Sequence, residues 1–197
     1  TLAPGERAEI FTLPETQAAG PATLEWQDSN RFHIPAVQKP QPLMTFEVTR
    51  DAPYVGAPMP PLSLREIARA PIDGAPLQRF ELMEKSAPGG AVLGINGKTA
   101  AEAEPIHAYV GTTEVWEVTN TTAYDHPFHL HGFFFQVLDI DGTPPAVKEW
   151  KDTINVEPDR RLRLAVSFDD RPGMWMFHCH ILDHADLGMM GMLMLMK

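Results

Sequence analysis

Cys179 is the only cysteine in the 197-residue chain, and it stands directly between His178 and His180. This triplet limits the fold more than any other feature, because it ends a segment, residues 173–179, that is predicted to be a β-strand. Successive side chains of a strand point to opposite faces. The two imidazoles therefore lie on one face and the thiol on the other, so both faces of this strand need partners.

A second group of histidines, His126, His129 and His131, lies upstream. By the same alternation, His129 and His131 point one way and His126, three positions earlier, points the other. If the two strands are neighbours, four histidines converge on one face, while His126 meets the thiol on the opposite face. The loop after the triplet can then bring His184 and Met189 to the thiol side. The sequence thus predicts two metal sites back to back.

The ligand types point to copper. A thiolate, two imidazoles and a distant thioether suit a one-electron copper site, whereas a closed zinc site prefers a tight tetrahedron. A group of imidazoles with open positions suits copper that binds oxygen, and Cys179 joins the two sites through the backbone. Other interpretations of the same residues are a zinc site, a Cys179 nucleophile with a histidine base, and chance polar residues beside a core cysteine.

The rest of the C-terminal part predicts an all-β fold, a sandwich or barrel of short strands separated by turn residues. A strand begins at residues 79–83, and only residues 181–187 favour a helix. We expect residues 133–135 (three phenylalanines) and the alternating methionines after Met189 to face the core. The remaining predicted strands are residues 107–110, 113–119, 129–139, 153–156, 161–168, 173–179 and 190–196.

The N-terminal part is organised differently. Residues 1–50 contain two short predicted strands, 22–26 and 44–48, which make too small a core to stand alone. Residues 51–75 form a Pro-rich linker with a short helix, which Ser63 and Glu66 cap. We therefore predict an unfinished domain at 1–50, the linker at 51–75 and a complete domain at 76–197.

Composition excludes some partners. The formal net charge of −10 argues against nucleic acid or an anionic membrane surface. The chain has no run of the eighteen or more apolar residues that a membrane span needs, and no signal peptide is visible in it. One cysteine permits no internal disulfide, so cysteine usage does not indicate the compartment.

The two histidine motifs, HPFHLHG at residues 126–132 and HCHILDHADLGM at 178–189, resemble those of the multicopper oxidases (laccases, bilirubin oxidases and bacterial cuprous oxidases). The likeness extends to WKDT at residues 150–153 and to the opening LAPGER at residues 2–7. It implies cupredoxin-like Greek-key β-sandwiches that take single electrons from a phenolic or metal-ion reductant and reduce dioxygen to water. Four coppers are implied: the type 1 ion on His126, Cys179, His184 and Met189, the type 2 ion on His129, and the type 3 pair on His131, His178 and His180.

The sequence departs from the family in two ways. The trinuclear cluster of these oxidases takes eight histidines, and the two His-x-His motifs of their first domain have no counterpart here. The opening resembles the middle of their second domain, so the resemblance implies a C-terminal portion. We expect the N-terminal half to be bound non-covalently as a separate chain. Ala185 stands where some members carry a proton-delivering Glu, and Asp186 is a candidate substitute.

The resemblance also implies a periplasmic or secreted location. The alternative function is that of a single blue-copper electron-transfer module without oxygen chemistry, and the number of bound coppers separates the two.

Overall fold

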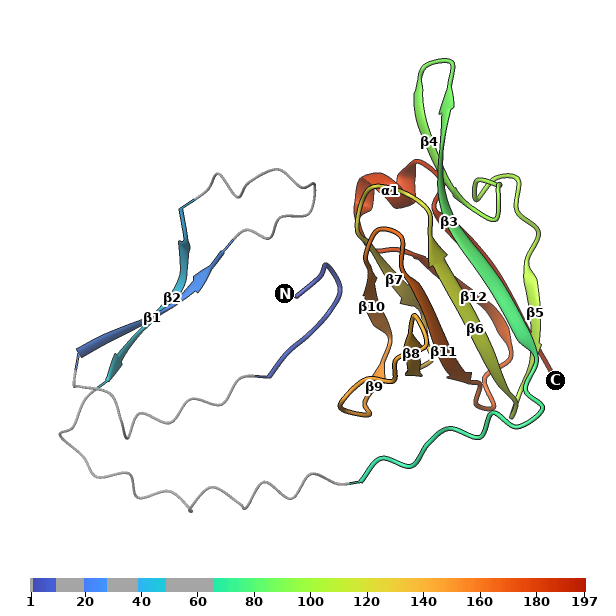
Figure 1. The fold of residues 1–197 in the computed structure, drawn as a ribbon, viewed down its shortest axis with the longest axis horizontal. Helices are drawn as coiled ribbons and strands as arrows, with labels where there is room; N and C mark the ends of the chain where they lie inside the picture. Colours follow the sequence, from blue (N-terminus) through green and yellow to red (C-terminus); the bar gives the residue numbers. More distant parts are fainter. Residues whose placement is uncertain (1, 10–19, 28–38, 49–65) are drawn as a thin grey trace. The chain divides into compact units, whose positions relative to one another are not determined.

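The computed structural model describes residues 2–9, 20–27, 39–48 and 66–197. The chain divides into two compact units. One comprises residues 8–66, and the other combines residues 2–7 with residues 67–197. Figure 1 shows both, coloured along the sequence.

The first unit contains a two-stranded antiparallel sheet of β1 (Gly20–Trp26) and β2 (Gln41–Val48), with a bulge between Leu24 and Glu25. The predicted strands 22–26 and 44–48 lie within these elements. The sheet exposes several large apolar side chains, among them those of Trp26 and Phe46. The assignment of residues 1–50 to an unfinished domain stays a prediction.

The predicted linker helix is wrong where the structure describes it. Ser63 lies outside the described residues, but residues 66–70 are not helical. Gln136 explains this, because its side-chain amide donates to the carbonyl of Ala68 (2.8 Å) and its oxygen accepts the backbone N–H of Ala70 (2.9 Å). These bonds hold the segment in a non-helical conformation against the sandwich.

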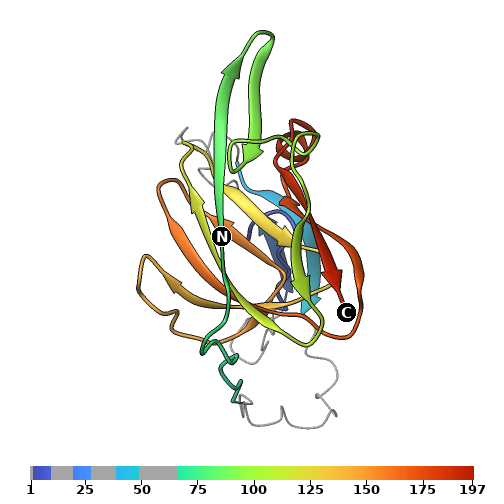
Figure 2. The ribbon, with the colours of Figure 1, turned by 90° about the vertical axis from the view of Figure 1, so that its right-hand side faces the viewer.

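The second unit is a sandwich of two sheets, as the sequence predicts (Figures 1 and 2). Within it, β5 pairs with β13 and β3 with β6 in parallel, and the other neighbours are antiparallel. The five-stranded sheet has the order β10 (Thr153–Val156), β7 (His126–Leu130), β12 (Gly173–Cys179), β13 (Met190–Met196), β5 (Ile106–Tyr109). The six-stranded sheet has the order β4 (Gly90–Ile95), β3 (Leu77–Ala87), β6 (Thr113–Asn120), β11 (Arg161–Ser167), β8 (Phe135–Ile140), β9 (Trp150–Lys151).

Aromatic side chains fill the space between the sheets. Trp116 on β6 is fully buried, and its ring centroid lies 4.8 Å from that of Phe80 and 5.4 Å from that of Phe177. Phe128 on β7 completes the group. Burying such rings contributes strongly to the driving force for folding, and it holds the sheet that carries the histidine motifs against the second sheet.

The prediction of one strand over residues 129–139 is wrong. β7 and β8 belong to different sheets, and the chain turns between them at Gly132, whose φ is 76°. A Cβ at this glycine would collide with the ring of Trp175. Arg171 donates to the carbonyl of Gly132, and its guanidinium lies 5.0 Å from the ring centroid of Phe133. The turn thus depends on contacts from residues far along the chain.

Two predictions about core residues are also wrong. In β13 the leucines, Leu193 and Leu195, face the core, and the alternating methionines lie half-buried on the outer face. Both sets are apolar, so alternation alone could not assign the faces. Of the three phenylalanines, Phe133 and Phe135 are buried as predicted, but the side chain of Phe134 is 52% exposed.

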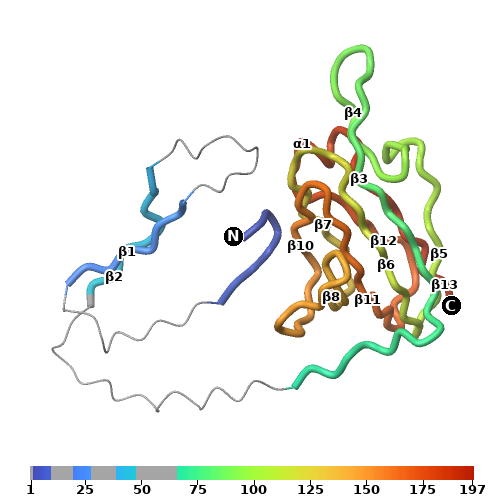
Figure 3. Tube along the Cα trace, viewed as in Figure 1, coloured from blue at the N-terminus to red at the C-terminus, as the bar shows by residue number. Residues whose placement is uncertain are grey.

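The remaining elements agree with the sequence or add to it. The helix α1 (Leu182–Asp186) lies within predicted residues 181–187, whereas β4 and β9 were not predicted. The tube in Figure 3 follows β12 through α1 into β13. No helix in the described part of the chain is long and apolar enough to cross a membrane.

Candidate metal centres

Strand pairing places the histidine motifs as predicted. β12 pairs antiparallel with β7, with His178 opposite His129 and Cys179 opposite Phe128. Phe128 and Cys179 are buried between the sheets, while the two histidines lie on the outer face. The sheet therefore separates two groups of side chains that could bind metal.

The group on the inner face, called the buried group here, consists of His126 and Cys179, which are buried, and His184, which is half-buried. The Nδ1 atoms of the two histidines lie 3.0 Å apart, and each lies 3.6 Å from the sulfur of Cys179. The point equidistant from these three atoms is about 2.0 Å from each, close to the bond lengths between a metal ion and imidazole nitrogen or thiolate sulfur. The three residues thus fit a single metal ion in trigonal geometry.

The loop between β12 and β13 brings the other predicted ligands to this group. α1 carries His184, whose carbonyl accepts the N–H of Met189 (3.0 Å), and the carbonyl of Met189 accepts the N–H of Cys179 (3.1 Å). The side chain of Met189 is fully buried in the same core. The four predicted ligands of this site therefore lie on β7 (His126), at the end of β12 (Cys179) and in the loop between β12 and β13 (His184 and Met189).

Thr122, which the sequence analysis missed, sets the orientation of His126. The hydroxyl of Thr122 donates to the side-chain oxygen of Asn120 (2.9 Å) and lies 2.6 Å from Nε2 of His126. The carbonyl of Tyr124 is a second acceptor for this hydroxyl proton (3.3 Å), so with the proton on either acceptor the hydroxyl oxygen accepts from Nε2–H. Nδ1 of His126 is then unprotonated and faces the sulfur. A lone threonine four residues before the motif carries no signal for this role.

Burial controls the protonation of this group. Desolvation, reinforced by the charge of His184, lowers the pKa of His126 to about 3. Desolvation also raises the pKa of Cys179 to about 12. The imidazole is thus neutral and ready to bind metal, whereas the thiol needs a bound cation to become a thiolate.

The second group, His129, His131, His178 and His180, lies on the outer face. Nε2 of His131 is 3.0 Å from Nε2 of His178. The ring centroid of His129 lies 4.8 Å from that of His131, 5.4 Å from that of His178 and 5.2 Å from that of His180. All four rings are partly or fully open to solvent. The group is wider than the buried one and presents open positions.

Hydrogen bonds fix which nitrogens face outward. Nδ1 of His178 donates to the carbonyl of Cys179 (2.8 Å), and Nδ1 of His129 lies 3.0 Å from the carbonyl of Asp152 and 2.8 Å from the hydroxyl of Thr153. Both rings therefore keep Nε2 for a metal. Burial, followed by the charge of His131, lowers the pKa of His129 to about 4, so this ring is neutral at neutral pH.

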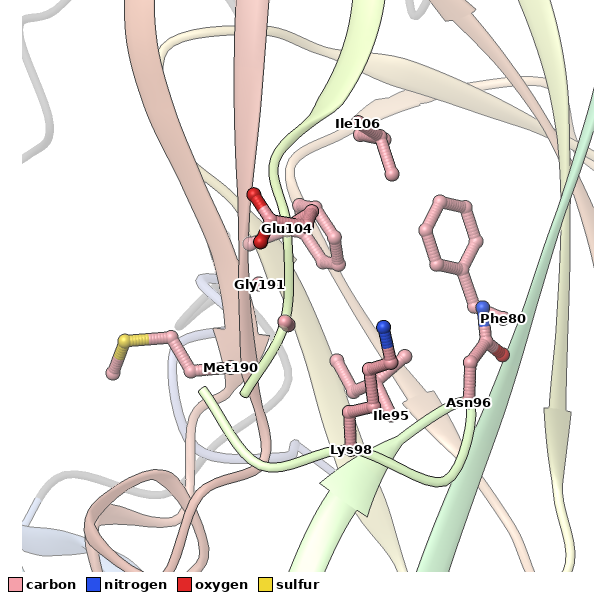
Figure 4. A pocket seen from close by; sticks show the side chains of 10 residues that line it. Phe80, Ile95, Asn96, Lys98, Glu104, Ile106, Met190 and Gly191 are labelled. Carbon is pink, nitrogen blue, oxygen red and sulfur yellow. The ribbon is translucent and has the colours of Figure 1, made fainter. Parts of the chain in front are cut away.

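A separate cleft opens where loop 96–105 crosses the edge of the sandwich (Figure 4). Its volume is about 190 Å³, the core rings of Phe80 and Phe177 form part of its wall, and Lys98 and Glu104 stand at its exposed rim. None of the predicted metal ligands lines it. The two candidate metal centres are therefore separate from this cleft.

Known proteins resemble this chain. The sequence model of the family described as multicopper oxidase matches residues 73–196. The multicopper oxidase mco of Staphylococcus aureus is 42% identical over 94 residues, which are 45% of this chain and 21% of that protein. The laccase of Bacillus subtilis (strain 168) is 38% identical over 122 residues, 52% of this chain and 24% of that protein.

The fold is also similar to solved structures. The McoA multicopper oxidase from the hyperthermophile Aquifex aeolicus superimposes with a TM-score of 0.73 at 30% identity, over 89% of this chain and 40% of that chain. A multicopper oxidase from Campylobacter jejuni, described as a metallo-oxidase, gives 0.72 at 25% identity, over 91% and 41%. The chain thus spans about two fifths of these structures.

Proposed function

The chain belongs to the multicopper oxidase family, and we propose that it carries the electron-entry site and part of the oxygen-reducing site of a laccase-like oxidase. The observation that carries this proposal is the back-to-back arrangement of two histidine groups on neighbouring strands β7 and β12, joined through Cys179. Bound copper would supply one-electron transfer and the reduction of dioxygen to water.

In this proposal, His126, Cys179 and His184 would hold the type 1 copper, and Met189 would be its weaker fourth ligand. The nearly equal spacing of the three donor atoms supports trigonal binding. Cys179 passes the electron through its own backbone, because His178 and His180 are its direct neighbours. The hydrogen bond from His178 to the carbonyl of Cys179 adds a second, shorter connection.

We assign His129 to the type 2 copper, and His131, His178 and His180 to the type 3 pair, of a trinuclear cluster. Their open outer face supports the participation of further ligands. We propose that the N-terminal polypeptide of the same oxidase covers this face and supplies the missing histidines, giving four coppers per assembly. The half-buried methionines of β13 beside His178 support a covered surface, since methionine adapts well to an interface.

The reductant binds at the type 1 side in this account. His184 sits on α1, where the side chains of Leu182 and Leu187 are exposed and offer apolar contacts to a phenol. The exposed carboxylates of Asp183 and Asp186 on the same helix instead suit a metal ion, and Asp186 is our candidate for proton delivery in place of the absent Glu at Ala185. A periplasmic or secreted location is proposed from the family resemblance.

Metal analysis combined with oxygen uptake tests the function. For the complete assembly we expect four coppers, an intense blue absorption and consumption of one dioxygen for every four electrons supplied by a phenol or a reduced metal ion. One copper and no oxygen uptake would instead support the electron-transfer module, which the buried group favours because its proposed ligands all come from this chain.

Mass spectrometry of the purified material tests whether the N-terminal half is a separate chain; a single 21.9 kDa species contradicts that prediction.

A further inference from the structure

The opening segment, residues 2–7, packs on the open histidine group. It belongs to the same compact unit as residues 67–197. Its turn is closed by hydrogen bonds between Ala3 and Glu6, from the N–H of Glu6 to the carbonyl of Ala3 (2.9 Å) and from the N–H of Ala3 to the carboxylate of Glu6 (2.9 Å). Glu6 also pairs with Lys151 at 3.4 Å. The segment is therefore fastened to the strand that precedes Asp152.

Two residues of this segment act near the histidine group, Gly5 by direct contact and Arg7 through Asp152. Gly5 has φ 84°, and a Cβ on it would lie 2.5 Å from a ring carbon of His180. Its bare backbone therefore rests directly on the imidazole. Arg7 donates to both carboxylate oxygens of Asp152, at 2.6 Å and 2.8 Å, and to the carbonyl of Gly5 at 2.9 Å. A guanidinium that binds a carboxylate through two parallel bonds fixes its orientation as well as its charge.

The carboxylate of Asp152 in turn orients a buried hydroxyl. Thr153 donates its single hydroxyl proton to Asp152 Oδ1 at 2.9 Å. The oxygen of Thr153, 2.8 Å from Nδ1 of His129, can then only accept, so Nδ1 carries the proton. The backbone carbonyl of Asp152 accepts from the same Nδ1–H at 3.0 Å. Both acceptors leave Nε2 of His129 unprotonated, the form that binds metal.

We propose that Arg7, Asp152 and Thr153 are positioning residues that set the tautomer and the ring orientation of His129, and that Gly5 sets the ring of His180. This rests on the proposed function, since it concerns how the open group binds copper. Outer partners of this kind change metal affinity by about 10- to 100-fold when they are lost. The LAPGER segment thus acts on the oxygen-reducing site although it contributes no ligand.

The substitution Asp152→Asn is the sharpest test, because an amide in the same place can donate to Thr153. The hydroxyl proton of Thr153 can then point toward Nδ1 of His129, which favours the tautomer that carries its proton on Nε2. Asp141→Asn is the matched control, since Asp141 also pairs with an arginine, Arg160, at 2.7 Å, away from the histidines. Thr153→Val, which keeps the shape and removes the acceptor, is a second variant that does not disturb the ion pair.

The two test variants, Asp152→Asn and Thr153→Val, and the control Asp141→Asn are made in the complete copper-loaded protein. They are compared by metal analysis, electron paramagnetic resonance and blue absorption. We expect the copper held by His129 to bind about tenfold or more weakly in Asp152→Asn, with the blue absorption retained and Asp141→Asn unchanged. In the metal-free protein, nitrogen NMR should show Nδ1–H at His129 in the parent and a mixture of tautomers in Asp152→Asn. Unchanged copper affinity and tautomer in both variants would overturn the proposal, whereas absence of blue absorption from the parent protein would overturn the proposed function instead.

Discussion

The two histidine groups lie on opposite faces of the same pair of strands, yet they differ in burial. His126, Cys179 and Met189 are closed off between the sheets, whereas His129 and His131 stand on a face that solvent reaches. In both groups a threonine hydroxyl lies within hydrogen-bond distance of one imidazole nitrogen and leaves the other nitrogen for the proposed metal, Thr122 in one group and Thr153 in the other. Hydrogen bonds therefore fix the orientation of an imidazole ring in both groups, whereas only one group is enclosed by the two sheets.

The two histidine groups also depend on different parts of the chain. The proposed ligands of the buried group come from β7, from the last residue of β12 and from the loop that joins β12 to β13. The open group depends on contacts from residues 2–7, and in our proposal on another polypeptide as well. Changes in the sandwich should therefore affect the buried group locally, while the open group should respond to distant changes.

The largest expected effect is that of Cys179→Ser. A hydroxyl cannot replace the thiolate as a copper ligand, so the blue absorption and nearly all oxidase activity should be lost. Optical spectra and oxygen uptake measure the two losses. Copper on the outer face should remain, as metal analysis can verify, and an intense blue band in this variant would refute the assignment of Cys179.

Thr122→Val should have the next largest effect. The variant removes the acceptor that holds Nε2–H of His126, so the affinity for the type 1 copper should fall about 10- to 100-fold while copper on the outer face is unaffected. Competition with a copper chelator, followed by the blue absorption, measures the change. The control is Thr121→Val, whose hydroxyl bonds to Glu81 and the carbonyl of Leu82 instead. Equal affinity in the two variants would contradict the role of Thr122.

Met189→Leu should act more mildly. Loss of a weak axial donor destabilises the oxidised copper, so the reduction potential should rise while the blue colour persists. Leucine fills nearly the same volume in this buried position, which keeps the fold intact. A redox titration that gives the parent potential would show that Met189 is not a ligand.

The smallest expected effect is that of Phe134→Ala. Its side chain is 52% exposed at the turn after His131, so the free energy of unfolding should change by no more than about 0.5 kcal/mol. The neighbouring Phe133→Ala, in the core, should cost about 3–5 kcal/mol. Denaturant titration of both variants measures the contrast, and a similar loss in both would mean that the outer face is covered at Phe134.

Much of the site could be predicted from the sequence because the ligands lie close together along the chain. Alternation in β12 placed His178 and His180 opposite Cys179, and the pairing with His129 followed once β7 was a neighbour. β10, β12 and β13 also have the predicted bounds. These strands are short alternating runs that end at turn residues, and both features are visible in the sequence.

What the sequence could not provide depends on contacts between distant residues. The turn at Gly132 depends on Trp175 and Arg171, and the non-helical conformation at Ala70 depends on Gln136. In β13 the leucines and not the methionines pack against the second sheet, which leaves the methionines on the outer face. The roles of Thr122, Thr153 and Arg7 are of the same kind. A single hydroxyl or guanidinium has no periodic pattern, so only the folded arrangement reveals it.

The central claim is that Cys179 connects an electron-accepting copper to an oxygen-reducing one. Stopped-flow absorption tests it directly: the complete, copper-loaded protein is reduced without oxygen until the blue band bleaches and is then mixed with dioxygen. The account predicts that the band returns as oxygen is consumed. A band that stays bleached while dioxygen is present would contradict it.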